Sequence, residues 1–235
     1  MIPIKVESAW QGTVDCQKCG IRDMVLFADL NHEDFAAMHT PIDDLRFSPR
    51  STLYVEAQKA EFVMTIRSGM VKLVRNISDG RERIVRILRQ GDVVGLEAIA
   101  TGQYSNEAVA LTDLSVCRIP IQLIQQLSTT SPRLHKRLTT QWQSALQSAD
   151  DWIADLNFGS ARRRVAQLIL KMRDPLQPEI AAVFSREDMG GMLDLKLETV
   201  SREISRLIHD GLIRPVDKSN RRYEILNIDR LSQAD

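Results

Sequence analysis

The stretch that decides the fold runs from Phe184 to Ile213 and reads FSREDMGGMLDLKLETVSREISRLIHDGLI. Its apolar residues recur at helical spacing in two short segments, which predicts helices over 186–193 and 197–209. Ser185 is placed to cap the first helix. A three-residue connection, Asp194 to Lys196, separates the two helices. Two short helices joined by so tight a turn are typical of a helix-turn-helix.

The outer side of the second predicted helix carries short or forked polar side chains near its N-terminal end. When such a helix lies in a DNA major groove, this end touches the base edges. We expect Arg202 to donate to a guanine, Glu198 to accept from a cytosine amine, and Ser201 to contact a neighbouring base. The alternative is a helical hairpin whose polar side is only solvated.

A basic hairpin is predicted to follow the second helix. Residues 212–216 and 222–226 alternate as short strands do, and a polar turn, Asp217 to Arg221, joins them. A basic hairpin in this place is a wing, which contacts phosphates. The helix expected over 161–172 adds three arginines in its first turn, although these also fit a solvated surface. The expected phosphate contacts are Thr199, Ser205, Lys218, Arg221, Arg222 and Arg162.

Length and composition describe an ordinary globular protein. The chain has 235 residues, of which 43% are hydrophobic and 26% are charged, with a net charge of zero. Nucleic-acid binding therefore has to rest on a local cluster of cations. No apolar run has membrane-spanning length, and Met1 to Asp15 lacks the apolar core of a signal peptide. Three cysteines, an odd number, argue against a disulfide framework, and we expect a cytoplasmic protein.

The order of patterns along the chain predicts an α+β protein in four parts. Residues 1–44 form an N-terminal segment with a Cys-x-x-Cys pair and short helices, one of them over 32–38. Residues 45–120 contain short strands punctuated by glycines, which favours an antiparallel β-roll or barrel. Residues 121–157 hold a long helix, and residues 158–235 form the winged helix-turn-helix.

The long helix carries apolar or small residues spaced alternately by four and three, which predicts a helix–helix seam between two copies of the chain. Leu146 and Ile153 lie beside this seam, where we expect them to pack on the roll. The alternative is an ordinary amphipathic helix of the core. The predicted seam consists of Leu138, Trp142, Ala145, Ala149, Trp152 and Leu156.

Three segments carry a resemblance that covers nearly the whole chain: Arg67-Ser-Gly-Met-Val-Lys72, Gly91-Asp-Val-Val-Gly95 and Glu198-Thr-Val-Ser-Arg202. The chain resembles the Crp/Fnr family of the cyclic-AMP receptor protein and the fumarate-and-nitrate-reduction regulator. The resemblance implies a cyclic-nucleotide-binding-like β-roll (a double-stranded β-helix or jelly roll) in a homodimeric transcription regulator. It also implies a two-fold symmetric DNA operator and RNA polymerase as partners.

The last of these segments looks like the recognition helix of the oxygen-responsive branch of the family. Leu197 stands where the cyclic-AMP branch has an arginine, so it offers an apolar base contact that favours thymine. We therefore expect half-sites that resemble TTGA. Two further differences exclude cyclic AMP as effector. Leu96 follows Gly95 where family members that bind cyclic AMP have a glutamate, and Tyr104 precedes Ser105 where they have an arginine.

The oxygen-responsive branch holds a [4Fe–4S] cluster on four cysteines, and the resemblance matches Cys16, Cys19 and Cys117 to three of them. Val25 stands at the remaining position, so the fourth ligand is unknown, with Asp23 the nearest candidate. Three interpretations stay open: a cluster on these three thiolates, a thiol switch in which Cys16 and Cys19 form a disulfide, and cysteines without a redox role. In the last case Cys117 is a small buried strand residue.

Two other classes of function compete with DNA binding. The Cys-x-x-Cys pair fits a thiol–disulfide oxidoreductase, but it lacks the strand-then-helix setting of a thioredoxin. A ligand-binding module that regulates a partner protein is the second alternative. The basic wing and the Glu198-x-x-Ser-Arg202 set argue against this module, and a lone Cys-x-x-Cys pair is weak evidence for an oxidoreductase, so we expect a DNA-binding regulator and not an enzyme.

Overall fold

The computed structural model describes residues 25–30, 43–77, 82–174, 176–217 and 221–235. The chain divides into two compact units, one made of Met1–Arg75 and Val85–Leu146, the other of Asn76–Ile84 and Gln147–Asp235. The division falls inside the long helix, whereas the sequence predicted a boundary after it, at residue 157. The helix expected over 32–38, Cys16 and Cys19 lie outside the described residues.

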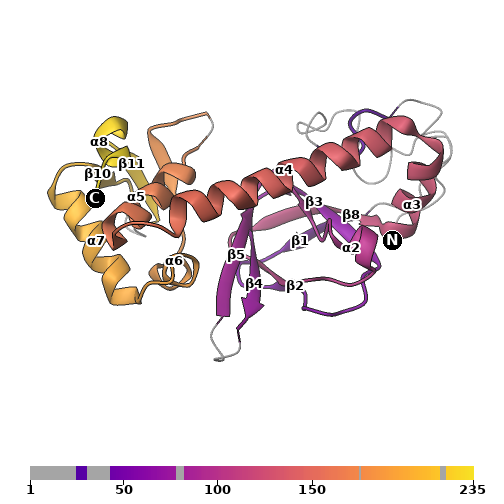
Figure 1. Ribbon diagram of the computed structural model, residues 1–235, viewed down its shortest axis with the longest axis horizontal. Coiled ribbons are helices and arrows are strands. Elements are labelled where there is room, and N and C mark those ends of the chain that lie inside the picture. The colour runs from indigo at the N-terminus through magenta and orange to yellow at the C-terminus, as the bar shows by residue number, and fades with distance from the viewer. Residues whose placement is uncertain (1–24, 31–42, 78–81, 175, 218–220) are drawn as a thin grey trace. The chain divides into compact units, whose positions relative to one another are not determined.

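The first unit is built around a roll of two antiparallel four-stranded sheets, as predicted (Figure 1). One sheet has the order β1-β8-β3-β6 and the other β2-β7-β4-β5. The strands are β1 (Asp43–Phe47), β2 (Thr52–Tyr54), β3 (Phe62–Ser68), β4 (Val71–Asn76), β5 (Glu82–Leu88), β6 (Val93–Val94), β7 (Glu107–Ala110) and β8 (Leu114–Pro120).

Strand β1 was not predicted, because its sequence begins with two aspartates and strands are poor in aspartate. Two other strands of the same sheet supply the compensating charges. Arg67 of β3 donates to the Asp44 carboxylate at 2.8 Å, and Nε of Arg118 on β8 donates to Asp43 at 3.1 Å. These pairs form only once the sheet is assembled, so the local sequence carries no sign of them.

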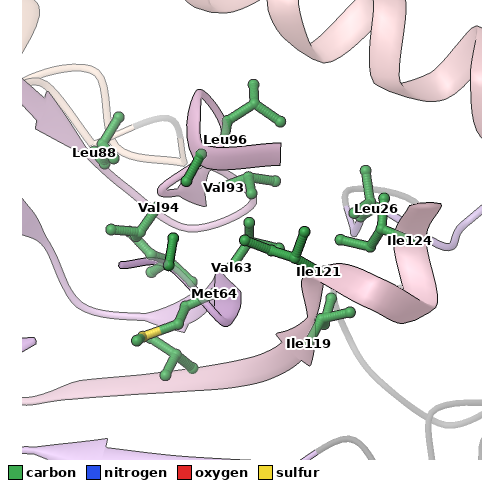
Figure 2. Close-up of a cluster of buried hydrophobic side chains, with 14 of the residues drawn as sticks. Leu26, Val63, Met64, Leu88, Val93, Val94, Leu96, Ile119, Ile121 and Ile124 are labelled. Atoms are coloured by element: carbon green, nitrogen blue, oxygen red, sulfur yellow. The ribbon is translucent and has the colours of Figure 1, made fainter. Parts of the chain in front are cut away.

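The core of the roll is one continuous apolar cluster, into which the helices that follow β8 also pack. Figure 2 shows Val63 and Met64 of β3 close to Val93 and Val94 of β6, with Ile121 beside them. Each such side chain stabilises the fold by about 1.5–3 kcal/mol when fully buried. The helices of this unit are α2 (Ala98–Thr101), α3 (Ile121–Thr130) and the first part of α4 (Pro132–Leu156).

The exposure of residues along α4 corrects the predicted seam. Leu138 belongs to the core cluster of its own unit, Ala145 packs against that cluster, and Leu156 is also buried. Leu146 and Ile153, which the sequence assigned to packing on the roll, are instead 64% and 54% exposed. Heptad spacing identified two adjacent apolar stripes on the helix. It did not identify which of the two is buried against other residues of the same chain. The second stripe, called the uncovered stripe below, consists of the exposed Trp142, Leu146 and Ile153 with the half-buried Ala149 between them.

The rest of the second unit is the winged helix-turn-helix that the sequence predicted. Its sheet has the order β10-β11-β9, and β9 was missed because three residues carry too little pattern. None of the helices in the described residues is both long and apolar enough to cross a membrane. The elements are α5 (Ala161–Lys171), β9 (Ile180–Ala182), α6 (Arg186–Leu193), α7 (Leu197–His209), β10 (Ile213–Pro215), β11 (Arg222–Ile225) and α8 (Ile228–Ser232).

Candidate nucleic-acid interface

Helix α6 begins where the sequence predicted, at a serine cap. The Ser185 hydroxyl accepts a hydrogen bond from the backbone N–H of Asp188 at 3.0 Å. The same hydroxyl donates to the Asp188 carboxylate at 2.7 Å. The cap satisfies one of the backbone donors that every helix leaves unpaired at its start. The Asp188 carboxylate also interacts favourably with the positive end of the helix dipole.

The turn between α6 and α7 depends on a glycine. Asp194 ends α6 in the left-handed conformation (φ 53, ψ 48), and the backbone N–H of Leu195 donates to the Gly190 carbonyl at 3.0 Å. A Cβ atom at Gly190 would lie only 2.6 Å from the Leu195 carbonyl oxygen. The chain can therefore fold back closely over α6, which fixes the direction in which α7 leaves the turn.

Helix α7 is anchored along its inner side and at its C-terminal end. Val200, Ile204 and Leu207 are buried, as their spacing predicted. Gly211 adopts a left-handed conformation (φ 67), and the backbone N–H of Leu212 donates to the Leu207 carbonyl at 3.0 Å. This glycine-closed end is a Schellman motif, which terminates the helix and starts the wing.

The outer side of α7 brings together the residues predicted to contact bases. Leu197, Glu198 and Arg202 are exposed, and Ser201 is half-buried between them. All four lie in the first two turns, the part of a recognition helix that reaches base edges in a major groove. Of the predicted phosphate contacts on α7, Thr199 is half-buried, while the exposed Ser205 donates its hydroxyl to the Ser201 carbonyl at 3.0 Å.

One residue of α7 was missed by the sequence analysis. Glu203 is the one charged residue that is buried within the described part of the chain. Its Oε1 accepts a hydrogen bond from Nη1 of Arg206 at 2.9 Å and lies 3.5 Å from Nε of Arg202. The apolar residues on either side of Glu203 in the helical pattern gave no signal that a carboxylate would be held there.

The wing lies in the sheet β10-β11-β9. Arg214 of β10 pairs with Glu224 of β11, its Nε donating at 3.0 Å. Arg221 and Arg222 are exposed at the start of β11. Lys218, a predicted phosphate contact, lies outside the described residues. The wing therefore has two exposed arginines near the start of β11, and a third, Arg214, pairs with a cross-strand carboxylate.

The three arginines at the start of α5 are engaged within their own unit. Arg162 forms an ion pair with Asp210 at 2.7 Å, Arg163 donates to the Phe158 carbonyl at 3.2 Å, and Arg164 donates to the Leu193 carbonyl at 2.7 Å. Hydrogen bonds from His209 and Arg162 hold the pKa of Asp210 below its usual range. Arg162, predicted to contact phosphate, is thus occupied by a carboxylate of the protein.

In the roll, the segments that depart from the cyclic-AMP pattern meet in space. The rings of Tyr54 and Tyr104 stack with centroids 3.6 Å apart, and both side chains are buried. The Tyr104 hydroxyl donates to the Phe62 carbonyl at 2.7 Å. A Cβ at Gly95 would lie 2.8 Å from the Tyr104 ring, so the ring rests directly on this glycine. Burial raises the pKa of both tyrosines, which stay neutral.

Among the cysteines, the structure describes Cys117 alone. It is buried on β8, where its register partners are Asp44 on β1 and Thr65 on β3. Val25 carries no donor atom, and the described residues include no group of three or more His, Cys, Asp or Glu side chains that could hold a metal ion. With three cysteines in the chain and Val25 at the fourth matched position, one subunit cannot supply four thiolates to an iron–sulfur cluster.

Comparison with known proteins agrees with this architecture. Residues 44–131 match the cyclic nucleotide-binding domain family, and residues 163–234 match the Crp-like helix-turn-helix domain family. The transcriptional activator protein FnrL of Cereibacter sphaeroides is 28% identical over 208 residues, which cover 84% of this chain and 83% of that protein. The fumarate and nitrate reduction regulatory protein of Escherichia coli K12 is 27% identical over 207 residues, covering 85% and 83%.

Solved structures show the same fold. The structure of FixK2 from Bradyrhizobium japonicum superposes with a TM-score of 0.75 at 28% identity, covering 83% of this chain and 98% of that one. A transcriptional regulator of the CRP family from Thermus thermophilus has a TM-score of 0.67 at 24% identity, covering 80% and 95%, which is a likeness of fold.

A nucleotide-binding-type roll followed by a helix-turn-helix with an exposed polar recognition helix defines a class of DNA-binding transcription regulators, not of enzymes. The two family matches together cover more than half of the chain. The chain belongs to the Crp/Fnr family of transcription regulators.

Proposed function

We propose that this regulator acts as a homodimer that reads a two-fold symmetric operator with TTGA-like half-sites. The observation that carries the proposal is the outer side of α7, where Leu197, Glu198, Ser201 and Arg202 gather at the N-terminal end. Arg202 donates to guanine O6 and N7, Glu198 accepts from a cytosine N4 amine, and Leu197 contacts a thymine methyl group.

Phosphate contacts complete the proposed interface without adding sequence information. The exposed cations at the wing, Arg221 and Arg222, support this role, and Lys218, which lies between β10 and β11 in the sequence, is the third proposed contact. Thr199 and Ser205 of α7 contribute hydroxyl groups. Arg162 contributes only after it releases Asp210, so we expect it to add the least of the proposed phosphate contacts.

The dimer is proposed to form through the uncovered stripe of α4, namely Trp142, Leu146, Ala149 and Ile153. Ala149 is the one small residue among three large apolar ones, so two helices can approach closely at Ala149. The stripe contains no carboxylate whose repulsion a ligand would have to relieve. The dimer therefore persists without an effector. Once bound to DNA, the regulator acts on RNA polymerase.

We further propose that the protein does not respond to cyclic AMP. A cyclic phosphate needs a countercharge when it is removed from water. The stacked Tyr54 and Tyr104 fill the space beside Gly95 with neutral aromatic rings. Leu96 and Tyr104 stand where the nucleotide-binding members have a carboxylate and a cation, which supports the same conclusion.

The experiment that tests the function is selection of bound duplexes from a random pool, with and without cyclic AMP. We expect palindromes with TTGA half-sites whose centres lie about one helical turn (~34 Å) apart. The enriched sequences and the affinity should not change when cyclic AMP is added. Recovery of TGTGA half-sites, or binding that requires cyclic AMP, would refute the assignment of α7 or of the roll.

A redox link through Cys16, Cys19 and Cys117 is also part of the proposal, supported by the kinship with regulators whose names refer to fumarate and nitrate reduction. Since Val25 leaves a cluster one thiolate short, we favour direct oxidation of the Cys16–Cys19 pair, in which two thiols lose two electrons and two protons to an oxidant. Lys18 and Arg22 lie next to these cysteines in the sequence, and nearby cations favour the reactive thiolate form of a cysteine.

The redox proposal predicts that mild oxidant changes operator affinity in the wild type but not in the Cys16→Ser or Cys19→Ser variant. Cys117→Ser should behave as the wild type, because a disulfide between neighbouring cysteines does not require Cys117. Visible absorption with iron and sulfide assays on protein purified without oxygen provides the control. Stoichiometric iron that depends on all three cysteines would establish the cluster instead. Equal affinity in oxidised and reduced wild type would remove both redox roles.

A further inference from the structure

The buried carboxylate of Glu203 has no role in the proposed base or phosphate contacts, yet it lies next to Arg202, one of the proposed base contacts. Its side chain is 5% exposed, whereas those of Arg202 and Arg206 are 60% and 59% exposed. Burying a carboxylate costs free energy unless cations or hydrogen-bond donors compensate it. An apolar residue would fill the same place at the edge of the α7 core without that cost.

The compensating charges are the two arginines that flank Glu203 on the exposed side of the helix. Arg206, three residues later, donates to Oε1 through Nη1 at 2.9 Å. Arg202, one residue earlier, places Nε at 3.5 Å from the same oxygen, an ion-pair contact longer than a hydrogen bond. The other carboxylate oxygen, Oε2, is buried and makes no hydrogen bond. Oε1 is therefore the one carboxylate oxygen that contacts both guanidinium groups.

The contact with Arg202 involves the particular edge of its guanidinium that base recognition does not use. A guanidinium is a rigid plane with five N–H donors, one of them at Nε. Nε is the guanidinium nitrogen nearest to Oε1, so both Nη groups lie farther from that oxygen and stay available to a base. These two groups form the fork that donates to O6 and N7 of guanine.

We infer that Glu203 is a positioning residue for sequence recognition. Its carboxylate holds the Arg202 guanidinium with the Nη fork turned outward before DNA arrives, and Arg206 keeps the carboxylate itself in place. A side chain oriented in advance loses less conformational entropy on binding. The inference rests on the proposed base contact of Arg202, and it assigns Glu203 a role that acts through that contact and not through DNA directly.

The test measures affinity for the selected operator and for the same duplex with the Arg202-contacted guanine replaced. Glu203→Gln keeps the size and an acceptor oxygen but removes the charge. We expect it to weaken operator binding by about 5-fold, on the order of one coupled pair, and to leave binding to the altered duplex unchanged. In the Arg202→Ala background the same substitution should have no effect, because its target is gone.

Two further variants keep the result interpretable. Glu224→Gln breaks a more exposed arginine–glutamate pair, which lies in the wing, and should leave base discrimination intact. Glu203→Leu replaces the carboxylate with an apolar side chain suited to burial, so it serves if Glu203→Gln fails to fold, with thermal unfolding as the check. It should lose discrimination in the same way.

The outcomes separate the two levels of the proposal. Discrimination that survives Arg202→Ala would refute the base contact itself. If Arg202→Ala abolishes discrimination while both Glu203 variants retain it, the positioning role is wrong and the base contact stands. If the Glu203 variants lose affinity equally for both duplexes, Glu203 has a structural role only. The same holds if the losses of affinity from Glu203→Gln and Arg202→Ala are additive in the double variant.

Discussion

We expect Arg202→Ala to weaken binding to the TTGA-type operator by about 1–3 kcal/mol and to relax the preference for guanine at the contacted position. The side chain is 60% exposed on α7, so its removal leaves the helix-turn-helix core intact. The main loss should therefore appear in discrimination between duplexes, and any loss of thermal stability should be small because Arg206 still pairs with the buried Glu203 carboxylate. Competition binding against duplexes with each of the four bases at that position measures it.

Arg222→Ala is the matched control, because it removes an exposed arginine from the wing instead of from α7. A phosphate contact adds affinity without sequence information. We expect Arg222→Ala to weaken binding to all duplexes alike and to flatten the dependence of log affinity on log salt by about one unit. If the two variants show the same profile, α7 does not read the bases through Arg202.

The second large effect is expected from the uncovered stripe of α4. The double variant Leu146→Glu/Ile153→Glu places carboxylates where the dimer proposal buries apolar side chains. An uncompensated buried charge costs about 3–5 kcal/mol, which raises the dissociation constant of the dimer roughly 10²–10⁴-fold. Sedimentation should show a monomer at micromolar concentration, where the wild type is a dimer without any effector. Operator affinity should fall with it, since one subunit reads one half-site.

Ser144→Glu provides the control on the same helix. Two residues correspond to a rotation of about 200° around the axis, so Ser144 lies on the side opposite Leu146. Ser144 is exposed, and a carboxylate there should leave the dimer unchanged. A double variant that remains dimeric would show that another surface forms the interface. A wild-type monomer that dimerises only when a ligand is added would contradict the effector-free dimer.

The sequence by itself determined the helix-turn-helix almost to the residue. Helices α6 and α7 span Arg186–Leu193 and Leu197–His209, the ranges that apolar spacing predicted. Their ends depend on near neighbours, such as the Ser185 cap and the left-handed Gly211. Such signals lie within about one helical turn of the helix end that they determine, so they can be identified from the sequence alone. The glycine-punctuated strands of the roll were predicted for the same reason.

Only the tertiary structure decided which side chains are neutralised and which apolar stripe is covered. Asp43 and Asp44 belong to a strand because arginines of other strands pair with them. Arg162 is engaged by Asp210, which lies 48 residues away. Along α4, Leu138 and Leu156 are buried while Leu146 and Ile153 stay exposed. Periodicity reports which residues share a side of a helix. What covers that side depends on contacts between residues distant in sequence, and these exist only after the chain has folded.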